Sequence, residues 1–163
     1  MDQSQTIKIF TTGGSIDKYY STQESDFVVG PPVIDQVLQE ANILLPYEVI
    51  SLLKKDSLDI TNEDRHHIYQ AIAADPSERI IITHGTDTMI QTAQSLSSIP
   101  NKIIVLTGAM QPAAFKVTDA VFNIGCALMA VQVLPIGTHV IMNGQVFDPT
   151  QAKKNVAQDR FEQ

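Results

Sequence analysis

The sequence is poor in cysteine and in positive charge. It contains one cysteine, Cys126, and no tryptophan. A single cysteine excludes an intramolecular disulfide and any cysteine-rich metal site. Eleven basic residues stand against eighteen acidic ones, which gives a net charge of −7. Nucleic acid and anionic membranes both need a positive protein surface, so we expect neither as the main partner.

Long apolar runs are also missing. None approaches the ~20 residues of a membrane span, and residues 1–10 show no basic segment ahead of a long apolar stretch, so no secretory signal is visible. We therefore expect a cytoplasmic protein. The length of 163 residues, at ~150 residues per domain, predicts a single domain over residues 1–163. The polar residues 148–163 are interpreted either as a flexible, solvated tail or as part of that domain.

Several motifs of well-known chemistry are absent. The chain has neither the dinucleotide pattern GxGxxG nor a phosphate loop ending in GK[ST], which disfavours nucleotide binding. It also lacks the GxSxG elbow of hydrolases and the metal motifs HExxH and CxxC. What chemistry remains is nucleophilic catalysis by a serine or threonine hydroxyl, which needs a nearby base.

What the chain does have is an alternation of apolar strands and helical segments. Strands are expected at residues 6–11, 47–53, 79–83 and 102–107, and helices at residues 31–41, 61–75, 86–97 and 118–131. Asn143-Gly144 predicts a tight hairpin between residues 139–143 and 145–147. This order predicts an α/β fold: a doubly wound, mostly parallel sheet with helices on both faces and a C-terminal β-hairpin. Residues 17–30 lack periodicity and are interpreted as a lid, a binding loop or a disordered segment.

Glycines, hydroxyls and carboxylates follow four consecutive predicted strands. They occupy residues 11–15, 54–59, 83–88 and 107–112. Ligands of doubly wound sheets bind beyond the carboxyl ends of the strands, so these segments are the candidate site. The candidate bases are Asp87, His84 or a lysine whose charge burial disfavours.

Each candidate also has a structural interpretation. Ser15 fits a turn or a helix N-cap, Thr86 or Asp87 fits the cap of the helix that follows, and Asp56 with Ser57 fits a polar turn. His84 is expected to pack or to orient a loop rather than to ionise. Lys153 and Lys154 fit a solvated surface.

Four segments resemble one enzyme family. Residues 12–16 (TGGSI) resemble the TGGTI signature of bacterial-type L-asparaginases, and residues 84–89 (HGTDTM) are identical to their second signature. Residues 107–112 (TGAMQP) are similar to the family's TGAMRP segment. Asp119 and Phe122-Asn123 match its downstream D…FN pattern. The resemblance covers essentially the whole chain.

The resemblance implies a role for each matched residue. Ser15 corresponds to the first nucleophile, and Thr86 to a second one that acts with Asp87 and Lys154. Asp87 would also bind the substrate ammonium, and Ser57 its α-carboxylate. The reaction would be attack on the side-chain amide of asparagine, release of ammonia and hydrolysis of an acyl-enzyme, with backbone amides stabilising the oxyanion. No metal or organic cofactor is implied. The remaining positions expected around the substrate are Gly14, Asp56 and Ala109.

The chain departs from the family pattern at four points. Ser15 replaces a threonine, Phe27 stands where the mobile loop has a tyrosine, and Leu58 replaces a glutamine that binds the α-amino group. Phe27 has no hydroxyl to donate or relay a proton. Family members are commonly about twice as long, and their second domain supplies a carboxylate to a neighbouring site. The chain is therefore expected to be a single-domain member or a first domain, forming a homo-oligomer, a dimer or tetramer.

Three functions stay open at this point. The first is an L-asparaginase with weak glutaminase activity, because one methylene of the substrate is worth only ~1–3 kcal/mol. The second is an amino-acid-binding or sensing module with little turnover, which the changes at Ser15, Phe27 and Leu58 would suit. The third is a half-enzyme that needs a partner chain.

Overall fold

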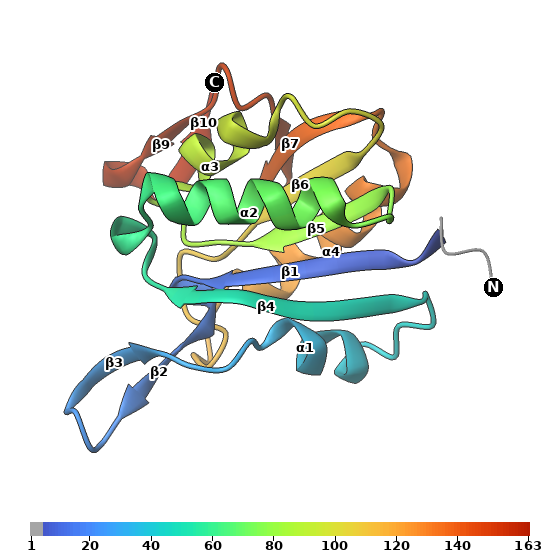
Figure 1. Ribbon diagram of the computed structural model, residues 1–163. Coiled ribbons are helices and arrows are strands. Elements are labelled where there is room, and N and C mark those ends of the chain that lie inside the picture. The colour runs from blue at the N-terminus through green and yellow to red at the C-terminus, as the bar shows by residue number, and fades with distance from the viewer. Residues whose placement is uncertain (1–4) are drawn as a thin grey trace.

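A six-stranded sheet organises the molecule. The computed structural model describes residues 5–163. Residues 1–4, which belong to the segment considered above for a secretory signal, lie outside the described residues. The strands follow the order β4-β1-β5-β6-β7-β8 (Figure 1). Their bounds are β1 Ile7–Gly13, β4 Tyr47–Lys55, β5 Arg79–Thr83, β6 Ile103–Thr107, β7 Gly137–Met142 and β8 Gln145–Phe147. The pairs from β4 to β7 are parallel, and β8 returns antiparallel to β7.

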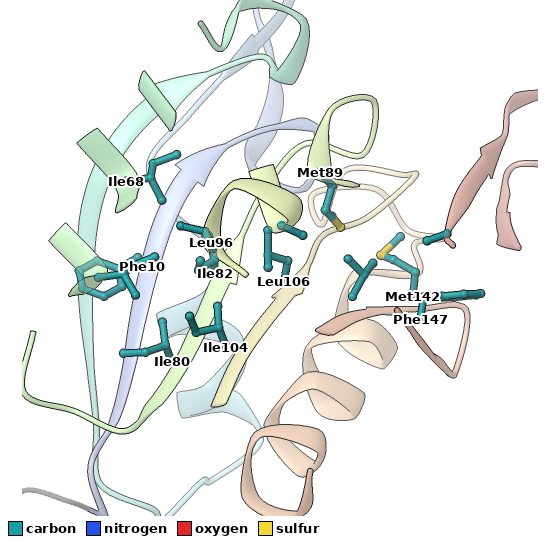
Figure 2. Close-up of a cluster of buried hydrophobic side chains, with 14 of the residues drawn as sticks. Phe10, Ile68, Ile80, Ile82, Met89, Leu96, Ile104, Leu106, Met142 and Phe147 are labelled. Atoms are coloured by element: carbon teal, nitrogen blue, oxygen red, sulfur yellow. The ribbon is translucent and has the colours of Figure 1, made fainter. Parts of the chain in front are cut away.

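Four helices cover the two faces of this sheet. Their bounds are α1 Ile34–Glu40, α2 Asn62–Ala74, α3 Met89–Leu96 and α4 Ala120–Val133. Side chains of α2 and α3 join one buried cluster, drawn in Figure 2, and side chains of α1 and α4 join a second. Alternate strand residues enter the two clusters: Ile80 and Ile82 pack under α2 and α3, whereas Ile81 packs under α4. The predicted doubly wound α/β fold is confirmed.

Local signals in the sequence explain the element boundaries. Helix α2 starts with a complete capping box, in which Thr61 and Asp64 each accept a hydrogen bond from the other's backbone amide. The turn between β7 and β8 holds Asn143 and Gly144 at φ 53° and 72°, the left-handed region that this dipeptide tolerates. No helix among residues 5–163 is both long and apolar enough to cross a membrane.

Residues 17–30 form regular structure that the sequence did not predict. Strands β2 (Lys18–Ser21) and β3 (Asp26–Val29) pair antiparallel as a hairpin that projects from the sheet beyond the arrowheads of β1 and β4 (Figure 1). The interpretation of this segment as disordered is wrong, whereas its roles as a lid or a binding loop stay predictions. Most of its side chains are exposed or half-buried, so no apolar alternation marks the strands.

Residues 148–163 are likewise folded rather than a solvated tail. Strands β9 (Lys153–Asn155) and β10 (Arg160–Glu162) form a second hairpin, with the short 3-10 helix η4 (Val156–Gln158) between them. Ala152 and Phe161 of this segment are buried in the cluster under α2 and α3. The Phe161 amide also donates to Asn143 Oδ1 at 2.9 Å. One buried aromatic therefore fixes an otherwise polar segment to the core.

Candidate active site

The site lies where the sheet changes its winding direction. Counted along the chain, the parallel strands have the order second, first, third, fourth, fifth. In such a sheet the crevice between the first and third strands, here β1 and β5, is the expected ligand position. The segments that leave these two strands, Gly13–Ser15 and His84–Asp87, meet at that crevice.

Glycines allow these segments to touch through their backbones. A Cβ placed on Gly14 would lie 2.4 Å from the Cα of Gly85, and a Cβ on Gly85 would lie 2.5 Å from the Cβ of Ser57. Both distances are shorter than any contact a real Cβ makes. Gly14 also has φ 88°, which few other residues adopt. The ends of β1, β4 and β5 thus come together only because these two positions carry no side chain.

Lys154 reaches this crevice from β9. Its Nζ donates to Thr86 Oγ1 at 2.8 Å and to Asp87 Oδ1 at 2.6 Å. The Lys154 side chain is 15% exposed and that of Asp87 is 41% exposed, so the pair lines a surface open to solvent on one side. Asp87 Oδ2 accepts no hydrogen bond from any residue that the structure describes. The predicted hydroxyl, carboxylate and amine are therefore in direct contact.

Thr86 and Asp87 do not cap the helix that follows. The N-cap of α3 is Thr88, and its side chain makes no capping hydrogen bond. Thr88 Oγ1 instead donates to the Ser57 carbonyl at 2.7 Å. The capping interpretation is wrong, because the polar side chains at residues 86–88 all turn toward neighbouring segments.

Ser57 supports the loop that carries Thr86. Its Oγ accepts the amide of Asp87 at 3.2 Å, and only 1% of the residue is exposed. Ser57 begins the 3-10 helix η3 (Ser57–Asp59), for which Asp56 is the N-cap and accepts the Leu58 amide. The polar-turn interpretation of Asp56 and Ser57 therefore holds, and the same turn touches the candidate nucleophile loop.

Asp56 also joins the β2–β3 hairpin to the site. Lys18 Nζ lies 2.5 Å from Asp56 Oδ2. Burial acts to raise the pKa of Asp56, but the hydrogen bonds from Lys18 and Leu58 and the charges of Lys18 and Lys154 outweigh it and lower the pKa. Asp56 is thus held as a carboxylate between two lysines. Sequence reasoning missed Lys18, because nothing in the polar segment 17–30 marked it.

Ser15 directly follows the buried glycine turn. It begins the 3-10 helix η2 (Ser15–Asp17), whose N-cap is Gly14, so Ser15 is not the N-cap itself. The residue is partly exposed. Asp17, at the end of η2, is 4% exposed and accepts the Val33 amide at 3.0 Å. Burial raises the pKa of Asp17 to about 6, against the smaller lowering effect of that hydrogen bond.

Ala109 lies at the end of β6 with its side chain in the apolar cluster under α1 and α4. The loop after it is held by Asp119, whose carboxylate accepts the amides of Met110 and Gln111 at 2.9 Å each. Asn123 Nδ2 donates to the same carboxylate and to the Gly108 carbonyl. Asp119 and Asn123, two of the residues that match the D…FN pattern, therefore fix the loop beside Ala109.

The β2–β3 hairpin presents aromatic side chains. Phe27 makes edge-to-face contacts with Tyr20, at 5.4 Å between ring centroids, and with Phe115, at 5.5 Å. Phe27 is 44% exposed. Phe115 belongs to the loop after β6, so this contact connects the hairpin to the segment that includes Ala109. Sequence reasoning did not single out Phe115.

His84 is fully buried behind the candidate nucleophile. Burial lowers its pKa to about 4, and the nearby charge of Arg65 acts in the same direction. The ring binds Gly85 O and Thr92 Oγ1. This agrees with the expectation that His84 orients a loop. Within residues 5–163, no three His, Cys, Asp or Glu side chains gather in a way that could hold a metal ion.

Comparison with known proteins gives a consistent family. Residues 6–162 match the family described as asparaginase, N-terminal. L-asparaginase 2-3 of Saccharomyces cerevisiae is 33% identical over 156 residues, covering 86% of this chain and 42% of that protein. A glutamyl-tRNA(Gln) amidotransferase subunit of Methanococcus maripaludis is 29% identical, covering 88% of this chain and 36% of that protein.

Solved structures agree with this. The thermostable L-asparaginase from Thermococcus kodakarensis superposes with a TM-score of 0.83 at 28% identity, covering 96% of this chain and 50% of that one. The chain therefore belongs to the asparaginase family, as its four matching segments indicated. It spans about 40% of the length of the curated relatives named here.

Proposed function

We propose that the chain hydrolyses the side-chain amide of L-asparagine to L-aspartate and ammonia. The observation that carries the proposal is the contact of Lys154 Nζ with Thr86 Oγ1 and Asp87 Oδ1. A threonine hydroxyl is a weak nucleophile that becomes reactive when a base within hydrogen-bond reach takes its proton. Family membership and the name of the yeast relative support the choice of substrate.

The first chemical step forms an ester on the enzyme. Thr86 Oγ1 attacks the amide carbon of the substrate while Lys154 takes the hydroxyl proton. The C–N bond then breaks, and Lys154 returns the proton to the leaving nitrogen, so that ammonia departs. Asp87 stabilises the Lys154 ammonium that forms in between. Water then attacks the ester, releases aspartate and restores the Thr86 hydroxyl.

Two further parts of the site would hold the substrate and the hydroxyl of Ser15. Asp87 Oδ2 would bind the α-ammonium group, and the Ser57 hydroxyl, which accepts from the Asp87 amide, keeps its own proton to donate to the α-carboxylate. Ser15 would supply a second hydroxyl from the β1 side, beside the backbone amides at Gly14. Asp56 would line the remaining wall together with the backbone of Ala109, whose side chain lies in the core. No metal or organic cofactor enters this scheme.

The test measures ammonia release from L-asparagine and L-glutamine by the 163-residue chain and by Thr86→Ala. We expect turnover that prefers asparagine, with weak glutaminase activity, and a loss of several orders of magnitude in the variant. Thr138→Ala is the matched control, because Thr138 lies in β7 near the amino end of the sheet. Equal rates for Thr86→Ala and the parent would refute the assignment.

A binding module with little turnover is the second candidate. Phe27 favours it, because the hairpin presents an exposed ring without the hydroxyl that the family's loop tyrosine carries. This candidate predicts that calorimetry detects L-asparagine or L-aspartate binding while ammonia release stays at background. Rapid turnover would exclude it.

We also propose that the chain acts as a homo-oligomer, a dimer or tetramer, in the cytoplasm. Helix α4 carries no charged residue, and its side chains Val121, Phe122, Met129 and Val133 are all more than half exposed. An exposed apolar surface of this kind marks an association site. Light scattering after size-exclusion chromatography should give a mass that is a multiple of 17.9 kDa, and a monomer at all concentrations would contradict this.

A further inference from the structure

A chain of hydrogen bonds runs from the outer helices to the loop that carries Thr86. Arg65 Nε on α2 donates to Thr92 Oγ1 on α3 at 3.2 Å. Thr92 Oγ1 lies 2.8 Å from His84 Nε2, and His84 Nδ1 lies 2.7 Å from Gly85 O. Thr92 and His84 are both fully buried. The hydrogen-bond chain therefore runs from the partly exposed Arg65 on α2, through two buried side chains, to the residue before the candidate nucleophile.

The direction of every bond in this chain is determined. A carbonyl oxygen only accepts, so His84 Nδ1 must carry the hydrogen that faces Gly85 O. Burial keeps the pKa of His84 near 4, so the ring is neutral at pH 7 and Nε2 carries no hydrogen. Thr92 Oγ1 must then donate to Nε2, which leaves its lone pairs for the Arg65 hydrogen. His84 is thus locked in the tautomer with hydrogen on Nδ1.

The hydrogen bond to the Gly85 carbonyl affects the orientation of Thr86. The peptide bond is planar, so the direction of the Gly85 carbonyl also sets that of the Thr86 amide. The backbone of Gly85 is already packed against Gly14 on one side and Ser57 on the other. A small rotation of this peptide would therefore move Thr86 relative to Lys154, which comes from a different part of the fold.

We propose that Arg65, Thr92 and His84 form a positioning chain that holds the Gly85–Thr86 peptide and so aims the Thr86 hydroxyl. The inference rests on the proposed function, and none of the three residues touches the substrate. Arg65 is itself held on two further sides, because its terminal nitrogens donate to Asn62 Oδ1 at 3.3 Å and Gln91 Oε1 at 3.1 Å. It also lines a pocket of about 360 Å³ that contains residues of α2 and α3, so the chain connects that surface to the site.

The kinetic test breaks the chain at its middle. Thr92→Val keeps the shape of the side chain and removes the hydroxyl. We expect kcat to fall about tenfold, close to the value of one hydrogen bond, while KM for L-asparagine changes less than about twofold. Ser97→Ala is the control, since its hydroxyl at the end of the same helix donates only to Ala93 O; it should leave both constants unchanged.

Two substitutions of His84 separate positioning from packing. Asn places an amide N–H near the position of Nδ1, so His84→Asn can still donate to Gly85 O, whereas His84→Ala cannot. We expect His84→Asn to keep more of kcat than His84→Ala. If Thr92→Val and a folded His84→Ala both retained the parent kcat, the positioning chain would be refuted.

A nuclear magnetic resonance measurement tests the positioning chain independently of enzyme activity. In protein labelled with ¹⁵N-histidine, the protonated and unprotonated ring nitrogens of His84 resonate far apart. We expect hydrogen on Nδ1 at pH 7, and a shifted Thr86 amide resonance in Thr92→Val but not in Ser97→Ala. Hydrogen on Nε2, or an unmoved Thr86 amide in Thr92→Val, would overturn the inference. If the parent chain released no ammonia, the proposed function would fail and these resonances alone would decide the positioning chain.

Discussion

The two hairpins outside the main sheet reach the same site and are attached in opposite ways. The β9–β10 hairpin is anchored in the core, because Phe161 is buried there and its amide donates a hydrogen bond to Asn143. The β2–β3 hairpin contacts the rest of the described structure through partly exposed side chains, in the Lys18–Asp56 ion pair and the packing of the Phe27 ring on Phe115. Figure 1 shows the β2–β3 hairpin standing away from the sheet.

The difference matches what each hairpin delivers. Lys154 lies opposite Phe161 in the β9–β10 register, so the side chain that touches Thr86 sits beside the residue that anchors the strand. A base must keep its position to within a fraction of an ångström. The β2–β3 hairpin brings aromatic side chains with few buried neighbours, and segments of low contact density are the ones that open. We infer that the β9–β10 hairpin holds Lys154 in a fixed position, whereas the β2–β3 hairpin opens and closes over the site.

The largest effect should come from the side chain that the anchored hairpin delivers. Lys154→Met removes the amine and keeps much of the chain length, so we expect kcat for L-asparagine to fall about 10³-fold, the usual range for a general base. Steady-state kinetics with circular dichroism checks this. Lys153→Met, on the exposed neighbour, should change kcat less than about twofold. Equal losses in the two variants would contradict the role of Lys154.

The anchor itself is the next target. Phe161→Ala empties a buried aromatic position, and we expect the free energy of unfolding to fall by about 3 kcal/mol. Phe27→Ala on the other hairpin, whose ring is 44% exposed, should cost about 1 kcal/mol or less. Urea unfolding of both variants measures the contrast. Similar losses in the two would show that the hairpins are attached equally well.

Protonation at the base of the β2–β3 hairpin should give a smaller effect with a defined sign. The pKa of Asp17 is raised to about 6, so the folded chain binds more protons than the unfolded chain between about pH 4 and about pH 6. This group therefore makes stability fall as the pH rises through that window, by at most about 1.4 kcal/mol per unit.

Asp17→Asn removes this dependence while Asn Oδ1 can still accept the Val33 amide. We expect the variant to be more stable than the parent by about 1–3 kcal/mol at pH 7, and the gain to vanish near pH 4. Urea titrations across this range measure the difference. Asp26→Asn, on the exposed part of the same hairpin, is the control and should show no such trend. A gain that is equal at pH 4 and pH 7 would argue against burial as its cause.

The smallest effect should come from the Lys18–Asp56 ion pair, which holds the β2–β3 hairpin against the site. Lys18→Met breaks the contact with Asp56, and both side chains are about a quarter exposed, so we expect less than about 1 kcal/mol in stability. The change should appear in KM, by about two- to fivefold, and in faster amide exchange over residues 18–29, with kcat nearly unchanged. A loss of kcat comparable to that of Lys154→Met would place Lys18 in the chemistry instead.

The sequence predicted the sheet and its helices well for a physical reason. The central residues of β5 and β6 are apolar without alternation because helices cover both faces of these strands. The turn predicted at Asn143-Gly144 is confirmed, and the capping box at Thr61 is a local sequence signal of the same kind. The two extra hairpins were missed because each lacks a repeating apolar face; a single residue, Phe161, decides where the second one lies.

The sequence motifs identified the main residues of the candidate site, but not the long-range contacts that hold these residues in place. Thr86 and Asp87 were found because they stand in a short motif at a strand end. The contact of Lys154 depends on where a distant hairpin docks, which no local pattern contains. The contacts of Lys18 with Asp56 and of Arg65 with Thr92 join residues 38 and 27 positions apart, between side chains that look like ordinary surface in the sequence.

The separation of Thr86 and Lys154 along the chain also affects when the site can assemble during synthesis. Lys154 follows Thr86 by 68 residues, so at a synthesis rate of roughly 5–20 residues per second the proposed nucleophile is made about 3–14 s before its proposed base. During that interval the sheet, its four helices and the β2–β3 hairpin can all form, yet the hydroxyl stays unactivated. Under the proposed function, hydrolytic activity would therefore arise only after the rest of the sheet has formed, when Phe161 enters the core and the β9–β10 hairpin docks.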